Sequence, residues 1–129
     1  MKSIFTYLIV ASFALLSSFT LQSDIDQVIS ALKSGDASEL SKYFDDNVEL
    51  TMPEKSNNYS KAQALVIVKD FFGNNAVKSF DVKHKGEQSG DQFCIGTLQT
   101  KAGNYRTTVF MKMKSSKQVI KEIRFQAIE

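Results

Sequence analysis

The chain has 129 residues, which is enough for one domain and too few for two. With 43% hydrophobic and 23% charged residues, it has the composition of a folded globular protein, which excludes an intrinsically disordered chain. A formal net charge of +2 gives no electrostatic reason to expect a nucleic acid or an anionic membrane as partner.

The first 20 residues have the pattern of a secretory signal peptide. A short basic start precedes residues 4–16, which are apolar except for Thr6 and Ser12, and small residues follow at positions 18 and 20. The apolar stretch, about 13 residues, is shorter than the ~20 that a membrane-spanning helix needs. We therefore expect cleavage after Thr20 and an exported mature domain of residues 21–129, periplasmic or extracellular, without membrane contact. An uncleaved membrane anchor is the alternative.

Two short helices are predicted next. Apolar residues spaced by three and four from Ile25 to Leu32 form one stripe of a helix, which Ser23 can cap and Gly35 can end. A second helix begins after Asp36, which forms a capping box with Glu39. Because only a few residues join them, the two helices predict a helical hairpin. Residues 45–47 break the helical pattern after it.

The rest of the chain predicts a sheet and one more helix. Residues 48–52 read as a short strand that Pro53 ends, because proline cannot donate to a strand ladder, and residues 54–58 read as a polar loop. Ser60 and Gln63 form a capping box that opens a helix running to Phe72. Four further strand-like runs are separated by short turns and predict an antiparallel meander; they cover residues 79–85, 92–100, 105–114 and 118–128. The expected fold class is α+β, with about three N-terminal helices on a curved, mainly antiparallel sheet.

Three segments carry a family resemblance. They are residues 31–36, which end in Gly-Asp; residues 40–50, in which Phe-Asp precedes a Val-Glu-Leu strand; and Pro53. This pattern resembles the nuclear transport factor 2-like (NTF2-like) superfamily. The chain is also similar to an uncharacterised family of small exported bacterial proteins with a domain of unknown function. The resemblance implies a single cone-like domain and a homodimer formed through the sheet, and it implies no activity.

The same superfamily includes enzymes such as ketosteroid isomerase, whose pattern has an Asp base next to the Pro that ends the first strand. Here Met52 precedes Pro53 and Thr51 precedes Met52, and neither side chain can accept a proton from carbon at neutral pH. This departure favours an exported, non-catalytic binding or interaction module. The alternative is a small-molecule enzyme, of isomerase or hydrolase type, that uses the cavity of the cone.

No residue is predicted to be catalytic. Four side chains are candidates to line a cavity that binds a small apolar ligand: Tyr43, Tyr59, His84 and Arg106. Each also has a structural explanation. Both tyrosines can pack against apolar neighbours, the histidine can be a buried hydrogen-bonded residue, and the arginine can belong to an exposed ladder with Glu122 and Arg124. His84 is predicted to share a strand face with Phe80 and Val82.

The remaining ionisable groups predict no metal site and no cofactor. Asp45, Asp46 and Glu49 are close in sequence, but a calcium loop needs more oxygen ligands and a glycine, so helix termination and solvation explain them better. Cys94, the only cysteine, is expected to be a small buried hydrophobe. A solvated strand edge explains the lysines of the last hairpin better than a nucleic-acid surface does; these are Lys112, Lys114, Lys117 and Lys121.

Overall fold

The structure, a computed structural model, describes residues 23–128, so the predicted signal peptide of residues 1–20 lies outside the described residues. Its elements are, in chain order, α2 (Asp24–Ser34), α3 (Ala37–Ser41), β1 (Phe44–Thr51), β2 (Ser56–Ser60), α4 (Lys61–Asn74), β3 (Val77–Gln88), β4 (Asp91–Thr100), β5 (Gly103–Lys114) and β6 (Lys117–Ala127). The predicted order of helices and strands is confirmed, with β2 as an additional strand.

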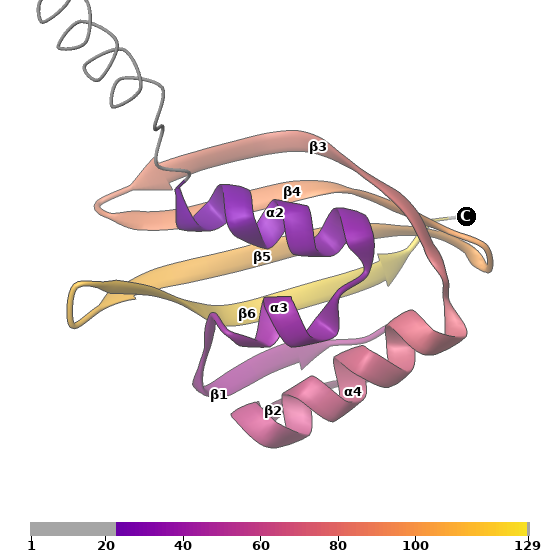
Figure 1. Cartoon of the computed structure of the whole chain (residues 1–129), viewed down its shortest axis with the longest axis horizontal. Coiled ribbons are helices and arrows are strands. Elements are labelled where there is room, and N and C mark those ends of the chain that lie inside the picture. Colours follow the sequence, from indigo (N-terminus) through magenta and orange to yellow (C-terminus); the bar gives the residue numbers. More distant parts are fainter. Residues whose placement is uncertain (1–22, 129) are drawn as a thin grey trace, which may run out of the picture.

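The six strands form one sheet in the order β2-β1-β6-β5-β4-β3. Strands β3 to β6 are the predicted antiparallel meander, whereas β1 pairs with β6 in parallel and with β2 antiparallel. Figure 1 shows the helices gathered on one face of the curved sheet. The expected α+β class, with a mainly antiparallel sheet, is thus confirmed.

The helix ends follow the sequence signals. Gly35 has φ of 64°, and a Cβ there would lie 3.0 Å from the Val77 side chain, so glycine fits both the backbone and the space. The Asp36 side chain accepts the Glu39 N–H at 3.0 Å. The reciprocal capping box at the start of α4 is also formed. Ser23 occupies the N-cap position of α2, but its hydroxyl donates to Asp26 at 2.9 Å instead of accepting a backbone N–H.

The segment from residue 42 to residue 60 differs from the prediction. Strand β1 begins at Phe44, not at residue 48, and β2 occupies residues that were predicted to be mostly loop. Strand β2 is exposed except at Tyr59 and therefore shows no alternation of apolar and polar residues. Its pairing partner β1 supplies the backbone hydrogen bonds, as in the pair of Leu50 with Asn57.

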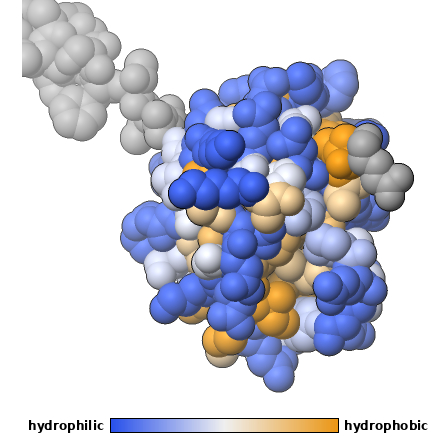
Figure 2. All heavy atoms as spheres, turned by 90° about the vertical axis from the view of Figure 1, so that its right-hand side faces the viewer, coloured by the Kyte–Doolittle hydropathy of each residue, from blue (hydrophilic) through white to orange (hydrophobic). Residues whose placement is uncertain are grey.

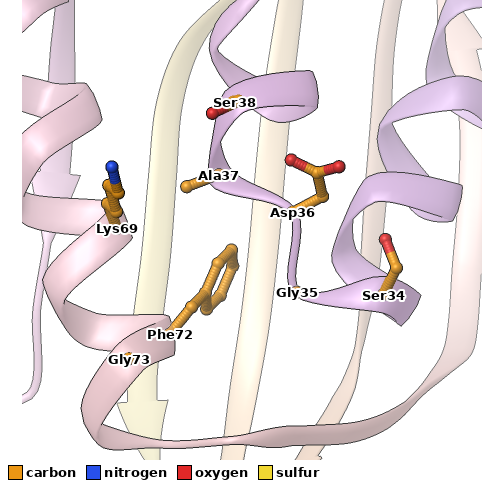
Figure 3. A pocket seen from close by; sticks show the side chains of 8 residues that line it. All are labelled: Ser34, Gly35, Asp36, Ala37, Ser38, Lys69, Phe72 and Gly73. Carbon is orange, nitrogen blue, oxygen red and sulfur yellow. The ribbon is translucent and has the colours of Figure 1, made fainter.

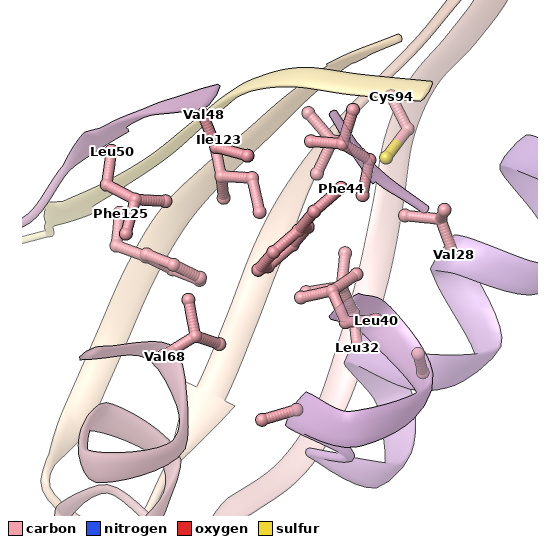
Figure 4. Packing of buried hydrophobic residues seen from close by; sticks show 14 of the residues in the cluster. Val28, Leu32, Leu40, Phe44, Val48, Leu50, Val68, Cys94, Ile123 and Phe125 are labelled. Carbon is pink, nitrogen blue, oxygen red and sulfur yellow. The ribbon is translucent and has the colours of Figure 1, made fainter. Parts of the chain in front are cut away.

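The core fills the space between the helices and the sheet. Figure 4 shows Val28, Leu32, Leu40 and Val68 of the helices against Phe125 of the sheet. All five residues are fully buried. Burying each large apolar side chain stabilises the fold by roughly 1.5–3 kcal/mol. The cone therefore has a packed interior where the resemblance suggested a ligand cavity.

Candidate functional site

The four candidate side chains lie on separate parts of the molecule. Tyr43 follows α3, is half-buried and donates its hydroxyl hydrogen bond to Gln27 of α2. Burial raises the pKa of this phenol. Tyr59 lies on β2, whereas His84 on β3 and Arg106 on β5 are exposed. The structure therefore does not bring these four side chains together around one cavity.

His84 was predicted to face the same way as Phe80 and Val82, and the structure corrects this. A bulge lies between Val82 and His84, and it places His84 opposite Ile95 in the register. One extra residue in a strand reverses the alternation of all residues that follow it. His84 is consequently on the side of the sheet that faces away from the helices.

Arg106 does not join the predicted charge ladder. It pairs in register with Gln126, whereas Arg124 pairs with Thr108. The Arg124 Nε donates to Glu122 of its own strand at 2.9 Å, and its guanidinium lies 5.6 Å from the ring centre of Phe110. The ladder is thus replaced by an ion pair within β6 and a cation–π contact across to β5.

One surface pocket of about 410 Å³ lies between the turn that joins α2 to α3 and the second half of α4 (Figure 3). It is lined by Ser34, Gly35, Asp36, Ala37, Ser38, Lys69, Phe72 and Gly73. Figure 3 shows Asp36 and Lys69 on opposite sides of the opening, but the Asp36 carboxylate already caps α3. Within the described residues, neither Ser34 nor Ser38 forms a side-chain hydrogen bond to the Asp36 carboxylate, so no activated serine is seen in this pocket.

A second pocket, of about 380 Å³, lies along α4 beside Tyr59. Its other lining residues are Ala62, Gln63, Val66 and Ile67, and Val66 is 58% exposed. This surface is almost entirely apolar. Figure 2 shows one end of the molecule as largely hydrophilic, with apolar surface in small separate patches.

The environment of Asp45 differs from the one predicted from the sequence. This residue was explained as a solvated helix terminator, but it lies in β1 with a side chain only 7% exposed. Lys114 and Lys121 each donate to its carboxylate at 2.8 Å, and these hydrogen bonds hold the pKa of Asp45 well below its usual range. The cluster links β1 to the β5–β6 hairpin. The lysine-rich hairpin was visible in the sequence, but the β1–β6 pairing that brings Asp45 to it was not.

The face of the sheet that points away from the helices, called here the outer face, has an apolar centre. It includes Phe93 and Ile95 of β4, which lie opposite Phe110 and Thr108 of β5 in register, and Thr97 of β4 beside them. Phe110 is 37% exposed, and Phe93 and Ile95 are partly exposed. At the end nearest the β3–β4 and β5–β6 turns, this face is hollowed by a pocket of about 560 Å³.

The remaining features of the described residues concern cysteine reactivity, metal binding and membrane-spanning helices. Cys94 is fully buried, and burial raises the pKa of its thiol to about 12, so it is the inert hydrophobe that was predicted. Among residues 23–128, no cluster of three or more His, Cys, Asp or Glu side chains is arranged to hold a metal ion. In the same range, no helix has the length and apolar character needed to cross a membrane.

Comparisons with known proteins agree with this fold. A family model described as a domain of unknown function, DUF4783, matches residues 25–126. A crystal structure of a DUF4783 family protein from Bacteroides uniformis is 36% identical, with a TM-score of 0.80 over 83% of this chain and 99% of the other. Another, from Bacteroides ovatus, is 39% identical, with a TM-score of 0.77 over 80% and 94% of the two chains.

More distant structures show the fold alone. An NTF2-like protein of unknown function from Cytophaga hutchinsonii is 11% identical, with a TM-score of 0.59 over 85% of this chain and 95% of the other. Comparison with curated proteins gives no significant match.

Proposed function

The chain belongs to the DUF4783 family of NTF2-like fold, and we propose that it is a non-catalytic interaction module that pairs with a second copy of itself through the outer face of the sheet. The observation that carries this proposal is the contrast between the two faces of the sheet. The inner face packs against helices over a filled core, whereas the outer face has a partly exposed apolar centre without a covering layer among the described residues.

The apolar centre of this face suits a protein partner. Contact residues of stable interfaces are apolar and aromatic at the centre and charged at the rim. Phe93, Ile95 and Phe110 form such a centre. A small ligand inside the cone is not supported, because the interior is packed, and the alternative of a cavity enzyme loses its motive for the same reason.

The charges around the centre favour a copy of the same chain. Arg106 on β5 and Glu49 on β1 are exposed, and neither forms an ion pair with another residue of the described range 23–128. A two-fold interface brings the same patch of two copies together, so a residue of each sign on one face can pair with its opposite on the partner. An outer face with both signs is therefore self-complementary.

The test is sedimentation of the purified mature domain at concentrations from 1 to about 200 µM. We expect a dimer that dissociates on dilution. Ile95→Asp places a charge at the centre of the proposed interface and should weaken dimerisation at least about 100-fold, because a buried unpaired charge is costly. Val66→Asp makes the same kind of change at an exposed position of α4. It is the matched control and should leave the dimer intact.

Circular dichroism should show that both variants remain folded. A wild-type domain that sediments as a monomer over the whole range would refute the proposal. So would an Ile95→Asp variant that dimerises as tightly as Val66→Asp.

We further propose that the domain acts outside the cytoplasm. The support is the signal-peptide pattern of residues 1–20. Expression of the full chain in a bacterium, followed by fractionation and N-terminal sequencing, should find a protein that begins at or near residue 21 outside the cytoplasm. An unprocessed chain that begins at Met1 and stays with the membrane would favour the anchor alternative.

A further inference from the structure

We infer that the hollow at the turn end of the outer face is a binding site for a small monocarboxylate with an apolar body, such as a medium-chain fatty acid. The hollow measures about 560 Å³ and its lining includes Gln88, Asp91, Phe93, Phe110, Lys112 and Lys121. Small-molecule sites have volumes of roughly 300–1,000 Å³ and combine apolar walls with a few placed polar groups. This site is separate from the interior of the cone. It goes beyond the proposed self-association, although it shares Phe93 and Phe110 with the proposed interface.

The apolar part of the site comes from two facing aromatic side chains. Phe93 of β4 and Phe110 of β5 are directly opposite in the register, so both rings stand on the outer face. Gly86 of β3 is opposite Phe93, and a Cβ at Gly86 would lie 3.0 Å from that ring. The glycine therefore lets the Phe93 ring lie over β3. The Arg124 guanidinium lies 5.6 Å from the centre of the Phe110 ring, so an alkyl or aryl group would contact the parts of the two rings that line the hollow.

The charge of the hollow favours an anion. Its lining side chains carry two positive charges, on Lys112 and Lys121, and one negative charge, on Asp91. Asp91 uses its Oδ1 to accept the Met113 N–H at 3.1 Å. Lys121 spends one of its three N–H donors on Asp45, whose charge Lys114 also shares. Two donors of Lys121 remain for a ligand.

Lys112 is the lysine in the lining that is not paired with a carboxylate among residues 23–128. It is exposed, and within residues 23–128 it forms no ion pair and no side-chain hydrogen bond. Two other lysines at this end of the β5–β6 hairpin, Lys114 and Lys121, form ion pairs with Asp45. A carboxylate at the mouth of the hollow would meet Lys112 directly and form a charge-assisted hydrogen bond.

The walls of the hollow are held in place before any ligand binds. The β3–β4 turn, which forms one wall, is tied to β5 by the hydrogen bond from Met113 to Asp91. The buried Gln118 of β6 donates its Nε2 hydrogen bond to the Gly90 carbonyl in the same turn. A preformed site loses less conformational entropy on binding than one that must be ordered.

The test is a titration of the 15N-labelled mature domain with octanoate, and in parallel with octan-1-ol, followed by NMR chemical shifts. We expect saturable shifts at the amides of Ser89, Asp91 and Lys112, with octan-1-ol binding about fivefold more weakly than octanoate because it lacks the charge. Lys112→Glu should weaken octanoate binding about fivefold or more and leave octan-1-ol binding unchanged. Lys101→Glu, which makes the same charge change at the β4–β5 turn, is the matched control and should change neither.

Phe110→Ala should weaken both probes, because it removes the apolar wall that they share. Equal affinities for octanoate and octan-1-ol, equal effects of Lys112→Glu and Lys101→Glu, or shifts that do not saturate would each overturn the inference. Repeating the titration on Ile95→Asp, which leaves the lining of the hollow intact, reads ligand binding separately from self-association. A wild-type domain that stays monomeric but binds octanoate saturably would refute only the proposed function.

Discussion

Replacing Asp45 by asparagine removes a buried negative charge. Within residues 23–128, Asp45 is the only carboxylate that accepts hydrogen bonds from two lysines. The change keeps the size of the side chain and one oxygen acceptor, so it tests the charge and not the packing. Asp45 is 7% exposed and accepts two hydrogen bonds of 2.8 Å, whereas Lys114 and Lys121 are 52% and 46% exposed. A hydrogen bond to a charged group contributes about 1.5–3 kcal/mol, and solvent around the lysines reduces this.

We therefore expect Asp45→Asn to lower the free energy of unfolding by about 2 kcal/mol at pH 7. For a urea m-value of about 1.5 kcal/mol/M, the midpoint of denaturation falls by about 1.3 M. The control is Asp46→Asn. The Asp46 side chain is 91% exposed and 3.8 Å from Lys114, so its loss should cost less than about 0.5 kcal/mol.

The effect should depend on pH in a direction that the structure fixes. The pKa of Asp45 is lowered in the folded state by its hydrogen bonds to Lys114 and Lys121, so the unfolded chain takes up a proton first as the pH falls. The stabilisation is complete above the unfolded pKa of about 3.9 and is lost as the pH falls below it towards the folded pKa. The difference between wild type and Asp45→Asn should shrink by about 1 kcal/mol or more between pH 7 and pH 3. Equal stability at pH 7, or a difference that is unchanged at pH 3, would refute this reasoning.

Two further predictions concern the interior. Gly96→Ala should destabilise the domain by about 2–3 kcal/mol and lower Tm by about 10 °C or more, because its Cβ would lie 2.5 Å from the Asp81 carbonyl oxygen and 2.8 Å from the Phe80 ring. The control Gly73→Ala meets no atom within 4 Å and should be neutral or slightly stabilising by calorimetry; equal Tm values for the two variants would contradict the contact argument. Cys94, with a thiol pKa of about 12, should resist Ellman's reagent at pH 8 in the folded domain and react fully in urea, so rapid labelling of the native protein would show that the core opens there.

Local sequence signals determined most of the elements. The Gly35-Asp36 junction and the Ser60–Gln63 capping box fixed the ends of helices, because caps depend on backbone groups within three or four residues. Strands β3 to β6 were predictable because each alternates against a buried core and follows its partner after a short turn. Cys94 was placed correctly for the same reason.

Contacts between distant segments decided the rest. The parallel pairing of β1 with β6 joins residues more than 70 positions apart, and only this pairing brings Asp45 to Lys121. The bulge in β3 turned His84 to the outer face, and a single inserted residue leaves no mark in a pattern of alternating polar side chains. The polar strand β2 forms because β1 offers it a free edge. The sequence alone therefore determined the layers of the domain, whereas the tertiary structure decided which polar side chains meet, since that depends on register between strands far apart in the chain.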